Sequence, residues 1–566
     1  MRITKVAPIA ISIAILIFPS CSNKKAAPRP VADVQPSVGP PPPPVAVPES
    51  ITIAADVRAT PTAEEVQVEL PLAAPAAAGG AWTRAQMRAN GTYAYKDTSF
   101  LPPQDREHNT EEYGRFEENP FLRPAENPLS TFSIDVDRAS YANVRRFLAS
   151  GQKPPRDAVR IEEMVNYFTY DYAEPEGREP FSITTELSAC PWNSRHKLML
   201  VGLQGKRMKT RDLPPNNLVF LIDTSGSMQE PDKLPLVRQG LRLLVEQMRP
   251  IDRISIVAYA GSAGLVLPST TGSEKGRILA AIDDLQAGGS TAGAEGIVLA
   301  YDVAKKNFSR EGNNRVILAT DGDFNVGVTS DGELERLIEQ KRRDNIFLTV
   351  LGFGTGNIKD SKMELLADKG NGNYAYIDSL NEARKTLVHE MGGTLFTIAK
   401  DVKIQVEFNP AVVGAYRLIG YENRVMRSED FNNDKKDAGE LGAGHSVTAL
   451  YEIAPPGEAL AGGVDPLKYQ NNTPRGTSGE LATIKLRYKH PDADTSQLLS
   501  RVVSNSASPV MSDNLRLASA VAELGMLLRN SEHKGDATYE EAARLAQSVR
   551  RDVGDLMELV RQAKAL

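Results

Sequence analysis

Residues 219–228 read Val-Phe-Leu-Ile-Asp-Thr-Ser-Gly-Ser-Met, an apolar run that leads directly into three oxygen-bearing side chains. The run is typical of a strand buried in a parallel sheet. Asp223, Ser225 and Ser227 follow it at every second position, just beyond the carboxyl end of the strand, where open α/β sheets bind ligands. One carboxylate and two hydroxyls, with no Cys or His in the stretch, favour a hard divalent cation such as Mg²⁺.

Two further segments carry residues suited to the same site. Residues 285–296, LQAGGSTAGAEG, form a glycine-rich loop that presents Thr291 ahead of a helical pattern. Residues 315–322, RVILATDG, form a second buried strand that ends in Asp321. If the ends of these strands are neighbours in the sheet, all five side chains converge on one point.

The set DxSxS…T…D resembles the metal-ion-dependent adhesion site of von Willebrand factor type A (vWA) domains, over roughly Asn217 to Phe396. The resemblance implies that the serines and the threonine contact the metal and that the aspartates act directly or through water. It also implies Mg²⁺ or Mn²⁺ as the cofactor, and an unidentified protein partner whose exposed Asp or Glu fills the last coordination position. The alternative for the first segment alone is a strand-to-loop turn with polar caps.

The alternation of strands and helices in the central region predicts a doubly wound, mostly parallel α/β sheet. A short run, Gly264 to Leu267, is expected to be an antiparallel edge strand. The expected strands are Leu218–Ile222, Arg253–Tyr259, Gly264–Leu267, Val316–Ala319, Phe347–Gly352 and Tyr374–Ile377. The expected helices are Lys233–Gln247, Glu274–Asp284, Ala292–Lys306, Asp331–Arg343, Lys359–Ala367 and Glu382–Thr394.

The length of 566 residues predicts more than one domain. We expect a signal segment, a Pro/Ala-rich tether too poor in large apolar residues to fold, and an α+β region in which folding signals begin near Asn127. A vWA domain, a β-rich domain and terminal helices follow. The boundaries, in chain order, are 1–21, 22–115, 127–205, 216–396, 399–510 and 512–566.

The flanking regions also resemble a known family. The phrases NPLSTFSIDVDRASYANVRRFL at 127–148 and AKDVKIQVEFNP at 399–410 are similar to the segments that surround the vWA domain in one family of bacterial lipoproteins.

The first residues of the chain predict its location. A charged start is followed by the apolar run Val6–Phe18 and then by Cys21. This segment resembles a bacterial lipoprotein signal, with Cys21 as the lipidated residue, and ordinary signal cleavage nearby is the alternative. The resemblance implies a lipid anchor in the cell envelope, and Ser22 favours the outer membrane.

Composition argues against several other functions. Lys and Arg number 66 against 72 Asp and Glu, without a dense basic stripe, so nucleic acid is not an expected partner. The histidines show neither a zinc spacing nor a Ser/His/Asp order.

Three other groups of polar residues are candidates for a site. Asp135 and Asp137 follow a strand as in haloacid dehalogenases, but Ala139 stands where that family has Thr or Val. We interpret Asp323 as a turn residue. The loop around Asp437, Glu440 and His445 is interpreted as a strand entry.

Our leading hypothesis is therefore a membrane-anchored vWA protein that binds an acidic partner for adhesion or scaffolding, and not an enzyme. A metal-dependent hydrolase is the first alternative, although the motif places no general base beside the metal apart from its own aspartates. The second is a structural envelope protein whose cation only stiffens the fold.

Overall fold

The computed structural model describes residues 110–289, 293–322, 324, 331–390, 396–458 and 479–566. The predicted signal segment with Cys21, almost all of the tether, Thr291 and Asp323 lie outside these residues. No helix within the described ranges is long and apolar enough to span a membrane.

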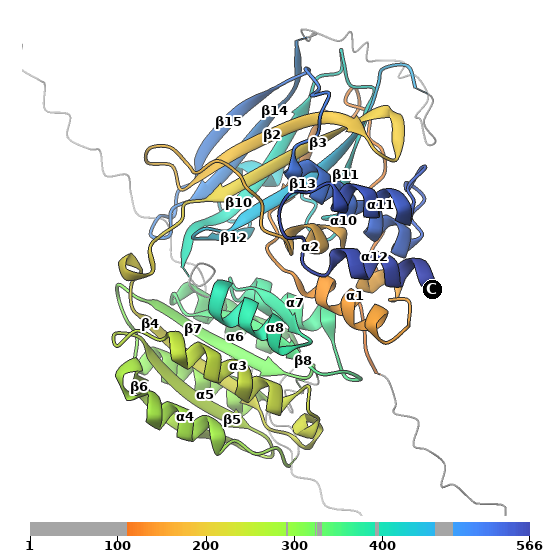
Figure 1. Ribbon diagram of the computed structural model, residues 1–566. Coiled ribbons are helices and arrows are strands. Elements are labelled where there is room, and N and C mark those ends of the chain that lie inside the picture. Colours follow the sequence, from red (N-terminus) through yellow and green to blue (C-terminus); the bar gives the residue numbers. More distant parts are fainter. Residues whose placement is uncertain (1–109, 290–292, 323, 325–330, 391–395, 459–478) are drawn as a thin grey trace, which may run out of the picture. The chain divides into compact units, whose positions relative to one another are not determined.

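The central domain is a mostly parallel sheet with helices on both faces, as predicted (Figure 1). Its strands lie in the order β6-β5-β4-β7-β8-β9, and only the edge strand β6 is antiparallel to its neighbour. The strands span β4 Asn216–Asp223, β5 Arg253–Tyr259, β6 Ala263–Thr271, β7 Asn313–Thr320, β8 Phe347–Phe353 and β9 Tyr374–Ile377.

Alternate side chains of β4 enter two different cores. Phe220 and Ile222 pack with one set of helices, α3 Leu234–Gln247, α4 Lys275–Asp283 and α8 Leu380–Arg384. Val219 and Leu221 pack with the other set, α5 Gly293–Lys306, α6 Asp331–Arg343 and α7 Asp360–Lys369. The apolar run of β4 is therefore buried on both faces because helices cover both sides of the sheet.

One predicted helix of this domain differs from the structure. The helix expected at Glu382–Thr394 begins at Leu380, and its α-helical part ends at Arg384. A π-helical segment, Lys385–Glu390, continues it.

The two flanking regions form shared β-sheets, which is a correction to the prediction of two separate regions at 127–205 and 399–510. One sheet has the order β1-β10-β14-β15, with β12 paired to β10, and the other has the order β11-β13-β3-β2. Strands from both sheets contribute to one hydrophobic core. The strands span β1 Leu129–Ser133, β2 Phe181–Cys190, β3 Asn193–Gly205, β10 Thr397–Phe408, β11 Ala415–Ile419, β12 Gly439–Gly442, β13 Ser446–Ala454, β14 Glu480–Lys489 and β15 Gln497–Ser504.

The physical reason for this sharing is that the hairpin β2–β3 cannot bury a face alone and needs neighbouring strands. Its partner β13 lies more than two hundred residues further along the chain, with Val447 opposite Leu203.

A layer of helices from the N-terminal flank and from the C-terminal segment covers the outer face of the second sheet. Leu200 of that sheet and Trp192 of the β2–β3 turn pack into the same core as the helices. Ser512 and Thr538 accept hydrogen bonds from backbone N–H groups of the first turn and thereby cap two of the terminal helices. The helices are α1 Ala139–Ala149, α2 Ile161–Asn166, α10 Asp513–Arg529, α11 Tyr539–Gln547 and α12 Leu556–Ala565.

Residues upstream of the predicted start at Asn127 already contact the folded body, so residues 110–115 do not belong to the predicted tether. Thr110 donates its backbone N–H to Gly356 over 2.8 Å. The buried Glu111 carboxylate pairs with Arg146 at 2.9 Å. Backbone pairing and single ion pairs hold this segment, and composition does not reveal such contacts.

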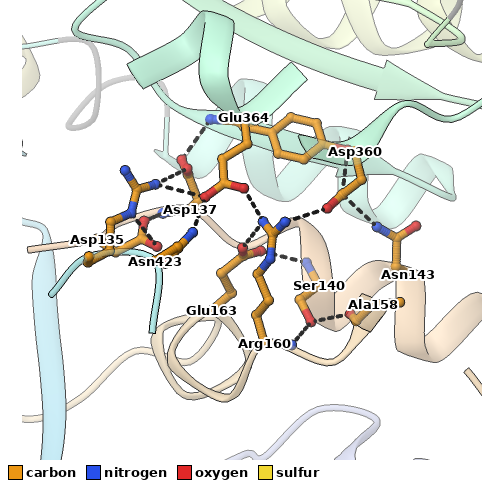
Figure 2. A network of polar contacts seen from close by, with 12 residues as sticks. Asp135, Asp137, Ser140, Asn143, Ala158, Arg160, Glu163, Asp360, Glu364 and Asn423 are labelled. Carbon is orange, nitrogen blue, oxygen red and sulfur yellow. Dashed lines mark hydrogen bonds and ion pairs between the residues drawn. The ribbon is translucent and has the colours of Figure 1, made fainter. Parts of the chain in front are cut away.

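A buried charged seam joins the vWA domain to both flanks (Figure 2). Helix α7 supplies Asp360 and Glu364, and Arg160 precedes α2. Arg160 contacts Asp360 at 3.0 Å and also pairs with Glu364. Glu364 in turn accepts a hydrogen bond from Arg424, which follows β11, at 3.1 Å. Glu364 thus links an arginine of the N-terminal flank to one of the C-terminal flank.

Replacement of Arg160 by Met should destabilise the protein by about 3–5 kcal/mol, because it leaves buried carboxylates without their cation. The control Arg156→Met removes an arginine whose side chain is 52% exposed, and it should cost no more than about 1 kcal/mol. Urea denaturation measures both free energies of unfolding. Equal effects of the two variants would contradict a stabilising role for the seam.

Glu523 on α10 predicts a pH dependence of stability. Burial, followed by the charge of Glu541, raises the pKa of its carboxyl to about 8 from 4.5. Neither carboxylate oxygen has a hydrogen-bond partner among the described residues. Between these two pKa values the folded chain keeps a proton that the unfolded chain has released, so stability falls as pH rises.

Glu523→Gln should remove that part of the pH dependence, worth on the order of 2–4 kcal/mol. The measurement is the free energy of unfolding from pH 4.5 to 8.5 in both proteins. A variant whose stability falls as steeply as that of the parent would contradict the assignment to Glu523.

Candidate metal site at the carboxyl ends of the central strands

Asp223 ends β4 and is completely buried. One carboxylate oxygen accepts hydrogen bonds from the Tyr259 hydroxyl at 3.0 Å and the Thr320 hydroxyl at 3.2 Å. The other accepts the backbone N–H of Ser225 at 2.8 Å. These donors come from β5, from β7 and from the loop after β4, so neighbouring strand ends fix the orientation of the carboxylate.

The two serines lie together directly after Asp223. Their hydroxyl oxygens, Oγ of Ser225 and Oγ of Ser227, are 3.1 Å apart. The carboxylate and both hydroxyls of the first predicted segment therefore gather at one edge of the sheet.

Asp321 reaches the same edge because β7 is the parallel neighbour of β4. Burial raises the pKa of Asp223, its hydrogen bonds to Ser225 oppose that rise, and the charge of Asp321 adds to it. The two carboxylates are thus close enough to repel each other. One oxygen of Asp321 accepts hydrogen bonds from Lys233 Nζ at 3.0 Å and from the Asn357 amide at 3.4 Å.

The glycine-rich loop is hydrogen-bonded to the first loop. Gly288 donates its N–H to Thr224 at 2.8 Å, and Gly226 donates to Gly289 at 3.0 Å. Gly289 has a φ of +93°, a conformation that side chains disfavour. Thr291 itself lies outside the described residues, so the structure brings together Asp223, Ser225, Ser227 and Asp321 and places the loop that leads to Thr291 beside them.

The described donors fit a hard divalent cation. All are oxygens, and the buried carboxylates repel each other in a way that a cation would offset. A bound cation would gain hydroxyl oxygens from the serines and negative charge from the aspartates.

A second acidic cluster, in the seam, is already neutralised by arginines. Carboxylate oxygens of Asp135, Glu163 and Glu364 lie within 4.8 Å of one another. Each carboxylate already pairs with Arg160 or Arg424 in the seam. Asp137 also pairs with Arg424, at 3.2 Å, so the pair of aspartates after β1 holds domains together and resembles no nucleophile site.

The acidic segment around β12 and the residue before β13 are interpreted from the sequence as a strand entry, and their contacts fit that interpretation. Asp437 pairs with Arg342 of α6. Burial, and next the charge of Arg138, lowers the pKa of His445 to about 3, so this imidazole is neutral at physiological pH.

Sequence reasoning missed four residues that hold the site: Tyr259, Thr320, Lys233 and Asn357. Tyr259 and Thr320 end strands at the same sheet edge, which is the signal that could have found them. Lys233 stands at the start of α3, and no spacing rule connects it to Asp321.

Comparison with known proteins identifies the class. The sequence model described as von Willebrand factor type A domain matches residues 217–390, the region that contains the predicted site. The flanks match two further models, described as von Willebrand factor at residues 107–200 and as the C-terminal region of YfbK at residues 393–566. The chain is a vWA-domain protein.

The family follows from a relative in Escherichia coli (strain K12), the protein YfbK. It is 45% identical over 451 residues, which cover 78% of each chain. The chain described here belongs to the YfbK family. Human inter-alpha-trypsin inhibitor heavy chain H4 is 29% identical over 150 residues, 25% of this chain and 16% of that protein. A solved von Willebrand factor type A structure from Catenulispora acidiphila covers 70% of this chain and 91% of its own, with 16% identity and a TM-score of 0.41.

Tyr259→Phe should lower the free energy of unfolding by about 1–3 kcal/mol, because a buried carboxylate loses a donor. Chemical denaturation measures the change. The control Tyr416→Phe removes another buried hydroxyl, one that donates to the Asn127 carbonyl at 2.8 Å. Since a neutral acceptor makes a weaker bond than a carboxylate, the control should cost less. A Tyr259→Phe protein as stable as the parent would show that this hydroxyl does not support Asp223.

Proposed function

We propose that the protein is a metal-dependent binding module of the cell envelope, with an adhesion or scaffolding role and no enzymatic activity. The cation, Mg²⁺ or Mn²⁺, is held by Asp223, Ser225, Ser227, Thr291 and Asp321. An exposed Asp or Glu of a partner protein completes the coordination. The observation that supports the proposal best is the pair of buried carboxylates, Asp223 and Asp321, at the sheet edge that also carries the two serine hydroxyls.

The residues of the site have different roles in binding the cation and its acidic ligand. Hydrogen bonds from Tyr259, Thr320 and the Ser225 N–H hold Asp223 in one orientation before any ligand arrives. The serines offer neutral oxygens, so the protein brings few negative charges to the cation. A divalent cation held this way keeps a net attraction for a carboxylate and an exchangeable coordination position. A lysine or an amide from a partner would not satisfy it.

Anchoring belongs to the same proposal. Cys21 carries a lipid in the cell envelope, with the outer membrane favoured, and the stretch from Ser22 onward acts as a spacer between the anchor and the binding domain. Such a spacer lets the site search for partners at a distance from the membrane surface.

The first test is binding of the metal itself by the full mature chain. Titration calorimetry with Mg²⁺ and Mn²⁺ should show one site, and Asp223→Ala should abolish it while circular dichroism stays unchanged. The control Asp302→Ala removes a largely exposed acid on α5, with 64% side-chain exposure, and should leave the affinity unchanged. Equal metal affinity in Asp223→Ala and the parent would overturn the proposed site.

The second test concerns the partner. Crosslinking in the native envelope followed by capture of the protein should recover a partner in Mg²⁺ and lose it in EDTA. Ser225→Ala should lose the partner in Mg²⁺ as well. Capture that persists in excess EDTA would rule out recognition through the cation, even if the metal binds.

A further inference from the structure

Lys233 lies within the predicted metal site. Its ammonium is 3.0 Å from an oxygen of Asp321, and the two side chains are 7% and 0% exposed. Asp321 is one of the residues proposed to hold the cation. The site therefore contains a positive charge of its own, supplied by the chain.

The aliphatic part of Lys233 occupies a slot that the fold keeps open. Gly354, which follows β8, has a φ of +71°, and a Cβ added there would lie 2.3 Å from Cγ and 2.4 Å from Cε of Lys233. The carbonyl of Gly354 accepts a hydrogen bond from the Tyr376 hydroxyl at 2.7 Å, which fixes this wall of the slot. A side chain at position 354 would collide with the aliphatic part of Lys233, so the glycine keeps open the space that the lysine occupies.

We propose that Lys233 is a built-in cation of the metal site that sets the site's charge and thereby its preference for acidic ligands. The inference rests on the proposed function. Asp223 and Asp321 bring two negative charges and Lys233 offsets one of them. With a divalent cation bound, the site is then net positive by one charge, whereas without the lysine it would be neutral.

The positive charge of Lys233 changes the affinities for the metal ion and for a carboxylate ligand in opposite directions. The ammonium repels the incoming metal ion and weakens its binding. The same ammonium leaves the metal-loaded site with a surplus positive charge and strengthens the binding of a carboxylate. A lysine that only stabilised the fold would shift neither affinity in this paired way.

The test compares Lys233→Met, which keeps the aliphatic part and removes the charge, with Lys305→Met. Lys305 is 63% exposed at the far end of α5, so the control has the same change of net charge in a screened position. Mn²⁺ affinity is measured by electron paramagnetic resonance. Carboxylate affinity is measured with acetate as the probe, from the loss of water-proton relaxation enhancement by bound Mn²⁺.

Lys233→Met should bind Mn²⁺ about tenfold more tightly and need about tenfold more acetate for half displacement of the water signal. Lys305→Met should match the parent in both titrations. Changes in the same direction for metal and acetate, or no change in either, would overturn the role of Lys233 while leaving the metal site itself intact. A parent chain that binds no Mn²⁺ would instead overturn the proposed function and this inference together.

A third measurement, thermal unfolding with and without Mn²⁺, distinguishes a misfolded variant from one with altered affinities. Removal of the ammonium leaves Asp321 without one of its partners, so the variant is expected to gain more thermal stability from saturating Mn²⁺ than the parent does. A Lys233→Met protein that stays unfolded in saturating Mn²⁺ would show that the lysine is structural and would overturn the assignment.

Discussion

The parallel pairing of β4 with β7 is the constraint on which the site depends. It brings the ends of two buried strands to the same edge, and with them Asp223 and Asp321. Carboxylates in such a place are costly, because burial disfavours their charge and each raises the cost of the other. Hydrogen bonds from Tyr259 and Thr320, at adjacent strand ends, partly stabilise the Asp223 carboxylate. The ammonium of Lys233 partly stabilises Asp321. The remaining cost is what a divalent cation would offset.

Ion pairs as well as apolar packing attach the vWA domain to the rest of the body. Apolar cores hold the central sheet and the β-sheets of the flanks. The seam adds ion pairs at their junction, with Glu364 between Arg160 and Arg424. Helix α1 of the N-terminal flank also contributes Ala139 and Ala142 to a core of the central sheet. Buried ion pairs are sensitive to geometry, since a misplaced partner leaves a charge unpaired. We infer that the seam fixes the vWA domain in one orientation relative to the flanks.

Sequence reasoning succeeded where a local pattern carries the information. Strands such as β4 and β7 are buried on both faces and read as continuous apolar runs, and the residues after them face the ligand edge by a general rule. This is why the doubly wound fold, the antiparallel edge strand β6 and the clustering of Asp223 with the serines could be predicted.

The remaining features depend on contacts between distant residues. Strand β13 pairs with β3 across a long stretch of chain, which no local pattern reveals. Strand β15 lacks a buried alternating face, since Leu498 and Val502 are both 53% exposed, so no local pattern indicates it. The acids of α7 are spaced by four residues, a pattern typical of a solvated helix face, yet they lie buried in the seam. Lys233 reaches Asp321 only because Gly354 leaves room for its side chain.

The most direct test of the central claim is anomalous diffraction from crystals of the protein grown with Mn²⁺. The account predicts a manganese peak at coordination distance from the oxygens of Ser225 and Ser227, with Asp223 beside it and an exchangeable ligand on the side away from the sheet. A saturated crystal whose manganese peak lies instead among Asp135, Glu163 and Glu364, with none near the serines, would contradict it.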